Sequence, residues 1–366
     1  MKTLLITLEY EPFLGGVANY YKNMVKYWPD AEKLQVWTNE AHELINEKWP
    51  VLKWLPAIFK LKQRINAEKI EHVIVGQLLP IGSIVYYASK MCKFKYSVVI
   101  HGMDFTMAIS QSRKATMARN ILVNAEAIVC GNNYVANLVR EFLGAKHLTK
   151  ITVINPGVSQ ADYQPLSNEL ANNLKTKYDL TNKYVFLSLG RLVKRKGVDQ
   201  VIMAMEVLAE RLPNFIYLIA GTGPDEAYLK NYAASVSNYF SSHVKFLGAI
   251  SEAEKWQWLN ACDCLIMPAR EENGDFEGFG IVYLEAGLAG KPVIAGASGG
   301  VADAVENMVN GLMVAPTDAE DIARVMAELM DDKELGQKLG ATGRERAIKE
   351  FAWPELVNKF YTTIKI

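Results

Sequence analysis

The chain has 366 residues, half of them hydrophobic, and its 40 basic and 40 acidic side chains give no formal net charge. Its four cysteines have neither the spacing of a disulfide framework nor that of a zinc site. No apolar stretch approaches the roughly 18 residues of a membrane span, and the first residues lack the pattern of a signal peptide. We therefore expect a cytoplasmic, globular protein, long enough for two domains.

The even charge balance hides an asymmetry. Residues 1–150 contain 19 Lys and Arg against 12 Asp and Glu, whereas the remainder contains 21 against 28. A basic first half favours an anionic partner surface. The alternative is a chance distribution of surface charge.

Short apolar stretches alternate with helical ones in the first half. We expect strands at residues 2–8, 33–38, 72–75, 96–100, 127–130 and 151–154. Repeated βα alternation predicts a parallel sheet. Gly15 and Gly16 lie between the first strand and a predicted helix, where a nucleotide-binding fold would have its glycine loop, but the full three-glycine pattern is missing. The alternative is a tight turn.

Residues 48–64 interleave aromatic and basic side chains, among them Trp49, Lys53 and Trp54. Such a segment could lie on an anionic bilayer, with its rings at the headgroups and its lysines near phosphates. The alternative is an ordinary amphipathic helix packed on the sheet.

The strand at 96–100 ends in His101-Gly102-Met103-Asp104. A histidine at the carboxyl end of a parallel strand points toward the crevice where such sheets bind ligands. His101 is therefore a candidate site residue. Asp104 belongs either to the acceptor side of that site or to the cap of the next turn.

A basic turn opens the second half of the chain. The predicted strand at 184–189 runs into Gly190-Arg191, and four residues later Lys196-Gly197 precedes a helix. Arginine offers a planar fork and lysine a point charge, and both suit a diphosphate. The alternative is a solvated turn. A further strand at 216–220 leads into a loop with Gly223, and residues 245–250 form another apolar segment.

Two glutamates, Glu277 and Glu285, flank the turn Gly278-Phe279-Gly280 and the start of a helix. A glycine turn at a helix start leaves backbone N–H groups at the positive end of the helix dipole, which favours a phosphate or a sugar hydroxyl. The two carboxylates would hold the two ends of a sugar nucleotide. The alternative for Glu285 is a solvated helix residue.

The run from Met267 to Gly300, together with Gly190-Arg191 and Lys196-Gly197, resembles the donor site of retaining glycosyltransferases of family 4. The similarity is greatest to bacterial phosphatidylinositol mannosyltransferases. It implies an α/β protein of GT-B fold, with two Rossmann-like domains facing across a cleft. We expect an acceptor-side domain at residues 1–165, a nucleotide-sugar domain at 166–350, and a C-terminal helix at 351–366 that crosses back to the first domain.

The same resemblance assigns roles to residues. Arg191 and Lys196 would hold the diphosphate, Glu277 the sugar hydroxyls and Glu285 the ribose, while His101 would meet the transferred sugar near its primary hydroxyl. The expected catalytic residues are His101, Arg191, Lys196 and Glu277. The expected donor-binding residues are Gly15, Gly16, Arg191, Lys196, Gly223, Leu247, Gly248, Glu277, Gly278, Phe279, Gly280, Ile281, Val282 and Glu285. Trp49, Lys53, Trp54 and Asp104 are expected on the acceptor or membrane side.

The function implied is transfer of a hexose from a nucleotide sugar to a glycan or glycolipid of the cell envelope, with retention and with no metal or cofactor. GDP-mannose is the expected donor, because residues 269–280 resemble the long acidic loop of mannosyltransferases. The alternatives are a UDP-sugar-dependent glucosyl- or N-acetylglucosaminyltransferase and a non-catalytic subunit of the same fold. We expect peripheral contact with the inner face of an anionic membrane and no nucleic-acid partner; the sequence predicts no oligomeric state.

Overall fold

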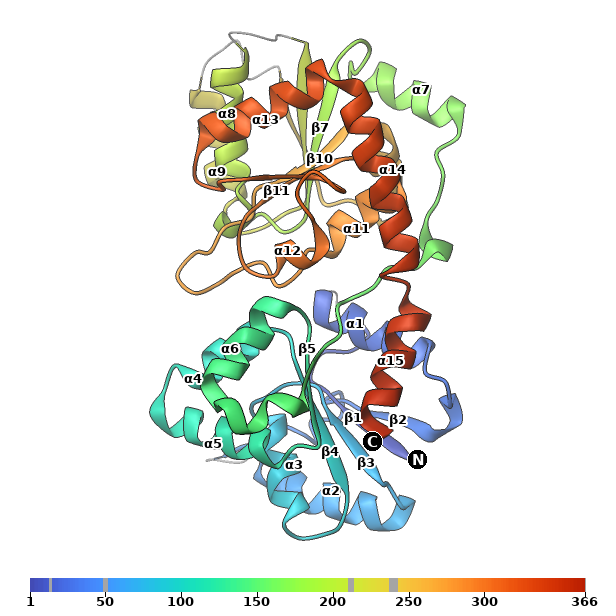
Figure 1. Ribbon diagram of the computed structural model, residues 1–366, viewed down its shortest axis with the longest axis vertical. Coiled ribbons are helices and arrows are strands. Elements are labelled where there is room, and N and C mark those ends of the chain that lie inside the picture. The colour runs from blue at the N-terminus through green and yellow to red at the C-terminus, as the bar shows by residue number, and fades with distance from the viewer. Residues whose placement is uncertain (13–14, 49–51, 210–213, 237–242, 366) are drawn as a thin grey trace. The chain divides into compact units, whose positions relative to one another are not determined.

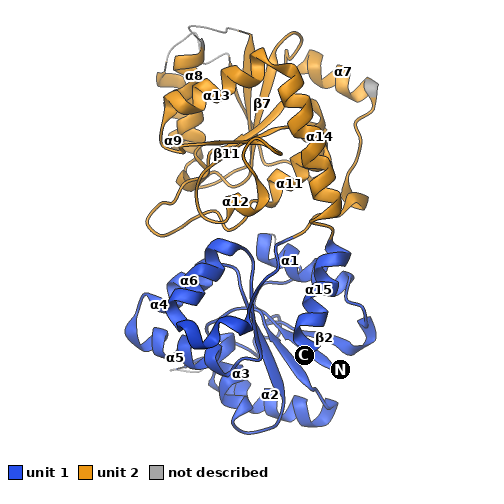
Figure 2. Cartoon of the chain, viewed as in Figure 1, with its two compact units in different colours: residues 1–156, 353–366 blue, residues 157–352 orange. Residues whose placement is uncertain are grey.

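The computed structural model describes residues 1–12, 15–48, 52–209, 214–236 and 243–365. The chain folds into two compact units (Figure 1). Unit 1 comprises residues 1–156 and 353–366, and unit 2 comprises residues 157–352 (Figure 2). Each unit is a parallel six-stranded sheet with helices, so the expected α/β class is confirmed.

The sheet of unit 1 has the strand order β2-β1-β3-β4-β5-β6. Its strands are β1 (Thr3–Ile6), β2 (Leu34–Trp37), β3 (His72–Val75), β4 (Lys95–Ile100), β5 (Ala127–Cys130) and β6 (Ile151–Val153). All six predicted strands are present. They are short and mostly apolar because helices bury both faces of a parallel sheet.

The helices of unit 1 include one from the far end of the chain. They are α1 (Gly16–Lys26), α2 (Leu55–Glu68), α3 (Ile81–Ser89), α4 (Met103–Ile109), α5 (Ser112–Asn124), α6 (Asn133–Leu143) and α15 (Trp353–Lys365). The apolar face of α15 packs beside α1, and Trp353 and Phe360 join a core shared with Tyr20 and Trp28 (Figure 1). The expected return of the C-terminal helix to the first domain is confirmed.

Unit 2 has the strand order β12-β11-β10-β7-β8-β9. Its strands are β7 (Tyr184–Leu189), β8 (Phe215–Ala220), β9 (Val244–Gly248), β10 (Cys264–Met267), β11 (Val293–Gly296) and β12 (Leu312–Val314). The helices are α7 (Asn168–Lys177), α8 (Val198–Ala209), α9 (Glu226–Ser235), α10 (Glu252–Ala261), α11 (Ile281–Leu288), α12 (Val301–Ala304), α13 (Ala319–Asp331) and α14 (Lys333–Lys349). In chain order, β8 and β9 are added on one side of β7, and β10 is then added on its other side. Ligands of such sheets bind outside the carboxyl ends of the strands at this switch point.

The chain enters and leaves unit 2 through two adjacent segments. The Val158 amide donates to the Phe351 carbonyl oxygen (2.8 Å), and Val158 also pairs with Ala352 in a parallel bridge. Both Val158 and Phe351 are buried in the core of unit 2. The compact units therefore divide at Gly157 and Trp353, and the boundary expected between residues 165 and 166 lies inside unit 2.

Two glycines bring the loops after β7 and β8 into backbone contact. A Cβ on Gly221, whose φ is +128°, would lie 1.9 Å from the carbonyl oxygen of Gly190. A Cβ on Gly223 would lie 2.2 Å from the carbonyl oxygen of Leu192. Only glycine allows this approach, and the contact fixes the position of residues 190–192.

Candidate active site

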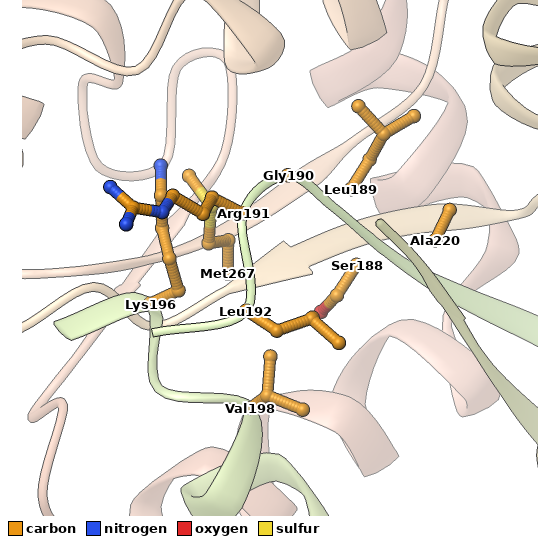
Figure 3. Close-up of a pocket in the computed structure, with 9 residues that line it drawn as sticks. All are labelled: Ser188, Leu189, Gly190, Arg191, Leu192, Lys196, Val198, Ala220 and Met267. Carbon is orange, nitrogen blue, oxygen red and sulfur yellow. The ribbon is translucent and has the colours of Figure 1, made fainter. Parts of the chain in front are cut away.

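A small pocket lies at the switch point of unit 2 (Figure 3). It is formed at the carboxyl ends of β7, β8 and β10 and by the turn that leads into α8. Its lining residues are Ser188, Leu189, Gly190, Arg191, Leu192, Lys196, Val198, Ala220 and Met267. The two expected diphosphate ligands, Arg191 and Lys196, thus line one pocket, and Arg191 is exposed.

A tightly packed turn positions Lys196. Residues Lys194–Lys196 form a 3₁₀ turn that ends at Gly197, where φ is +73°. A Cβ at Gly197 would lie 2.2 Å from the carbonyl oxygen of Pro268, directly after β10. The turn therefore packs against the end of β10, and Lys196 Nζ lies 2.5 Å from Glu277 Oε2.

Glu277 is 7% exposed and carries two cationic partners on one oxygen. Oε2 accepts from Lys196 Nζ and from Arg195 Nη1 (2.7 Å). Burial acts to raise the pKa of Glu277, but the charges and hydrogen bonds of Lys196 and Arg195 outweigh it, so that the pKa lies below its usual value. Within the described ranges no residue bonds to Oε1, which leaves this oxygen available to a ligand hydroxyl.

The backbone around Glu277 is held by the glycine loop after β11. The Gly300 amide donates to the Glu277 carbonyl oxygen (2.9 Å), and a Cβ on Gly299 would lie 2.6 Å from the same oxygen. Gly299 and Gly300 therefore support the position of Glu277.

The start of α11 lies close to the end of β10. Tyr283 donates its hydroxyl hydrogen to the Met267 carbonyl oxygen (2.7 Å) and its amide to the Gly280 carbonyl oxygen (2.9 Å). Gly280 has a φ of +82°, and a Cβ there would lie 2.3 Å from the Tyr283 ring. Ile281 and Val282 are in the first turn of the helix, where amide hydrogens precede the intrahelical ladder and favour an anion. The expected donor residues 278–282 thus form this turn.

Arg195, Asp275 and Arg270 extend the charged cluster beyond the expected residues. Arg195 Nε donates to Asp275 Oδ2 (3.1 Å), and Arg270 forms two hydrogen bonds with the carboxylate of Asp199 (2.8 and 2.9 Å). The Arg270 amide also donates to the Arg195 carbonyl oxygen (2.8 Å). The basic triplet at residues 194–196 gave a local signal for Arg195, but its acidic partners lie about 80 residues further along the chain.

Glu285 lies on α11 and pairs with a residue that sequence reasoning missed. Lys255 Nζ, from α10, is 2.5 Å from Glu285 Oε1 and 2.5 Å from Glu252 Oε1. Burial acts to lower the pKa of Lys255, but the carboxylates of Glu285 and Glu252 outweigh it and raise that pKa. The expected ribose ligand therefore has a lysine beside it.

The remaining donor residues of unit 2 lie at the same sheet edge. Leu247 and Gly248 end β9, and the Gly248 carbonyl oxygen accepts from the Gly221 amide (2.7 Å). Gly223 is required by its contact with Leu192, as described above. These positions border the loop after β8.

In unit 1, His101 is held by side chains from two other elements. His101 Nε2 lies 2.9 Å from the Tyr21 hydroxyl, which donates to the Gly76 carbonyl oxygen (2.6 Å). Asp104 accepts the amides of His101 (3.1 Å) and Gly102 (3.0 Å) on one oxygen and that of Leu78 on the other. Asp104 therefore organises the turn after β4, which is the capping alternative that the sequence left open.

Gly15 and Gly16 lie where α1 begins. A Cβ at either position would meet no described atom within 4 Å. Packing within the described part of unit 1 does not require a glycine at these two positions.

The aromatic and basic segment is only partly described, since Trp49 lies outside the described residues. Trp54 stacks on Tyr87 with 6.0 Å between ring centroids and 12° between planes. Lys53 forms an ion pair with Glu47. The described part of this segment thus packs against α3, and its positive charge is partly neutralised. Across the described ranges, no three His, Cys, Asp or Glu side chains are grouped so that they could hold a metal ion.

Comparison with known proteins shows which proteins this chain resembles. Residues 172–346 match the family described as "Glycosyl transferases group 1". The full-length likeness to the structure of Anabaena Alr3699/HepE in complex with UDP has a TM-score of 0.82 at 20% identity, covering all of both chains. The chain therefore has the GT-B fold, and just under half of it matches a glycosyltransferase family.

Two curated relatives are similar over nearly their whole length. A "GDP-mannose-dependent monoacylated alpha-(1-6)-phosphatidylinositol monomannoside mannosyltransferase" of Corynebacterium glutamicum is 29% identical over 99% of this chain and 97% of its own. A "GDP-mannose-dependent alpha-(1-6)-phosphatidylinositol monomannoside mannosyltransferase" of Mycolicibacterium smegmatis is 27% identical over 96% of this chain and 94% of its own.

Proposed function

We propose that this protein is a glycosyltransferase that moves a mannosyl group from GDP-mannose to a hydroxyl of a glycan or glycolipid, with retention of configuration. The observation that supports it most is the contact between Lys196 and Glu277 at the switch point of unit 2. It joins a cation suited to the leaving diphosphate to a carboxylate whose second oxygen can bind sugar hydroxyls. The names of the two curated relatives support the donor and the sugar.

The charge that develops on the leaving diphosphate needs electrostatic stabilisation. Arg191, Lys196 and the first turn of α11 would supply it, in the role that a metal ion has in other transferases. Glu285 would accept the ribose hydroxyls.

Glu277 would bind the sugar and not attack it. Its Oε2 atom is already bonded to two cations, which lower the nucleophilicity of the carboxylate as well as its pKa. The acceptor hydroxyl would instead attack from the face that the diphosphate leaves. Its proton would pass to the leaving phosphate oxygen, so that one C–O bond breaks as another forms.

Hydrolysis of GDP-α-mannose without an acceptor tests this reaction. We expect slow release of GDP that continues in excess EDTA, together with mannose that NMR detects first as the α anomer. Release of β-mannose would contradict retention. Activity that EDTA abolishes and magnesium restores would contradict the role given to Arg191 and Lys196.

A thermal-shift experiment tests the donor base separately from the chemistry. GDP at a hundred times its dissociation constant should stabilise the protein by about 2.7 kcal/mol, with a clear rise in melting temperature. UDP at the same concentration should give a smaller rise. If UDP stabilises the protein and GDP does not, the alternative UDP-sugar donor replaces GDP-mannose.

We also propose that unit 1 contacts the membrane that holds a lipid acceptor. None of the described helices is both long and apolar enough to cross a bilayer. Leu52 and Phe59, before and on α2, and Tyr87 and Met91, at the end of α3, are exposed apolar side chains, and α2 packs on α3. Such side chains can enter the interfacial region of a bilayer.

Phe59→Glu should weaken sedimentation of the protein with anionic vesicles several-fold, because an apolar side chain is lost and a negative charge is added. Lys60→Gln is the matched control. Lys60 pairs with Glu43 (2.9 Å), so its loss should have a small effect. Equal sedimentation of wild type and Phe59→Glu would remove the membrane contact and favour a soluble glycan acceptor.

A further inference from the structure

The hydroxyl of Tyr21 lies between two hydrogen-bonding groups of unit 1. One is the carbonyl oxygen of Gly76 (2.6 Å), which can only accept, and the other is Nε2 of His101 (2.9 Å). A tyrosine hydroxyl has one hydrogen to donate. That hydrogen goes to Gly76, so Nε2 of His101 must carry its own hydrogen and donate it to the Tyr21 oxygen.

The two partners of Tyr21 are themselves firmly placed. Tyr21 is fully buried, and the Gly76 amide donates to the Ile6 carbonyl oxygen (2.8 Å), so Gly76 is tied to the end of β1. Asp104 fixes the backbone at His101, and its oxygens already accept three amides. The contact between Tyr21 and His101 is therefore part of a rigid corner that joins α1, β1, β3 and β4.

The other ring nitrogen of His101 has a different environment. A neutral imidazole carries one hydrogen, so when Nε2 holds it Nδ1 has a lone pair. Burial lowers the pKa of His101 although Asp104 acts to raise it, which favours the neutral ring. None of the described residues donates to Nδ1, and this atom is not fully buried. A substrate hydroxyl can therefore reach it.

We propose that Tyr21 is a positioning residue that fixes His101 as the Nε2–H tautomer and so makes Nδ1 an acceptor for a hydroxyl of the transferred sugar. The tautomer follows from unit 1 alone. Its use in catalysis rests on the proposed function, together with the role that the family resemblance gives His101, a contact with the primary hydroxyl of the donor sugar. The Gly76 carbonyl oxygen thus determines, through Tyr21, that Nδ1 of His101 is the ring nitrogen that can accept a hydrogen bond from the sugar.

The tautomer is measured on the full-length protein with ¹⁵N-labelled histidine, without any ligand. Long-range ¹H–¹⁵N spectra distinguish the two tautomers, and the signals of His101 are those absent from His101→Gln. We expect the Nε2–H pattern in wild type and in Tyr20→Phe. Tyr20 is the matched control, because its ring also packs edge-on against His101 (5.1 Å) while the Tyr21 hydrogen bond is untouched. Tyr21→Phe should give a mixture of tautomers.

Two results would overturn the proposal: the Nδ1–H pattern in wild type, or an unchanged Nε2–H pattern in Tyr21→Phe. The wild-type spectrum decides the tautomer even if Tyr21→Phe folds poorly. If the proposed function fails because GDP-mannose is not used, this measurement still stands by itself.

Sugar selectivity tests the catalytic consequence. Wild type should prefer GDP-mannose over its 6-deoxy analogue in kcat/KM, and Tyr21→Phe should reduce that preference about fivefold, which is the loss of one neutral hydrogen bond. Tyr20→Phe should keep the wild-type ratio. An equal loss of activity toward both donors in Tyr21→Phe would indicate a structural role alone. It would contradict a hydrogen bond between His101 and the primary hydroxyl.

Discussion

Lys196→Ala is expected to lower kcat for transfer, or for donor hydrolysis, by about a hundredfold or more. Removing one preorganised electrostatic donor from a developing charge typically costs on the order of 3 kcal/mol of transition-state stabilisation. Lys196 lies in the switch-point pocket and bonds to Glu277, so its loss also removes one restraint on that carboxylate. The measurement is kcat and kcat/KM with GDP-mannose at pH 7, with GDP binding followed separately by thermal shift.

Lys194→Ala is the matched control for this effect. Lys194 has the same side chain in the same 3₁₀ turn, but it is exposed and does not line the pocket. Its replacement should leave kcat within a factor of about two, because a surface charge contributes little. If Lys194→Ala and Lys196→Ala lose activity equally, only the net charge of the turn matters. Near wild-type turnover in Lys196→Ala would remove its assignment to the diphosphate.

The elements that the sequence predicted well are those determined by local patterns. All six strands of unit 1 follow from short apolar stretches separated by helical ones, because most of their residues are buried. Arg191 and Lys196 line the same pocket because the strand, the turn and the following helix are consecutive in the chain. The glycines of this region were also informative, since Gly197 and Gly223 allow backbone contacts that a Cβ would prevent.

The partners of the candidate residues could not be predicted, because they come from distant parts of the chain. Arg195 and Glu277 are 82 residues apart, and Lys255 and Glu285 are 30 residues apart. The local hydrophobic pattern gives no sign that the two members of either pair are in contact. The expected domain boundary differs from the boundary between the units for a similar reason. Val158 belongs to unit 2 through its hydrogen bond to Phe351, a contact that only the folded chain reveals.

Glu277→Gln is expected to lower both activity and stability, and pH separates the two contributions. Glutamine keeps the shape of the side chain but leaves the positive charges of Lys196 and Arg195 without their shared carboxylate. Breaking a buried ion pair from one side costs about 3 kcal/mol of unfolding free energy. Losing the charged contact to the sugar costs about 2 kcal/mol in kcat/KM, or roughly thirtyfold.

The pH dependence has a definite sign. The pKa of Glu277 is lowered in the folded protein, so its ionised form stabilises the fold at pH values above the pKa of an unfolded glutamate. That contribution is lost as the pH falls through the lower, folded pKa. Chemical denaturation of wild type should therefore show a loss of stability over this acidic interval. Glu277→Gln should be less stable at pH 7 and should vary less over the same interval.

The double variant Glu277→Gln/Lys196→Met distinguishes the structural role of the ion pair from its catalytic role. Removing Lys196 together with Glu277 takes away a cation left without its carboxylate, so part of the lost stability should return. Activity should not return, because the diphosphate and the sugar have each lost a ligand. Glu272→Gln, a carboxylate in the same loop that bonds to Arg270, is the control for a charge change away from the pocket. Recovery of activity along with stability in the double variant would mean that Lys196 and Glu277 hold the fold together and do not contact the donor.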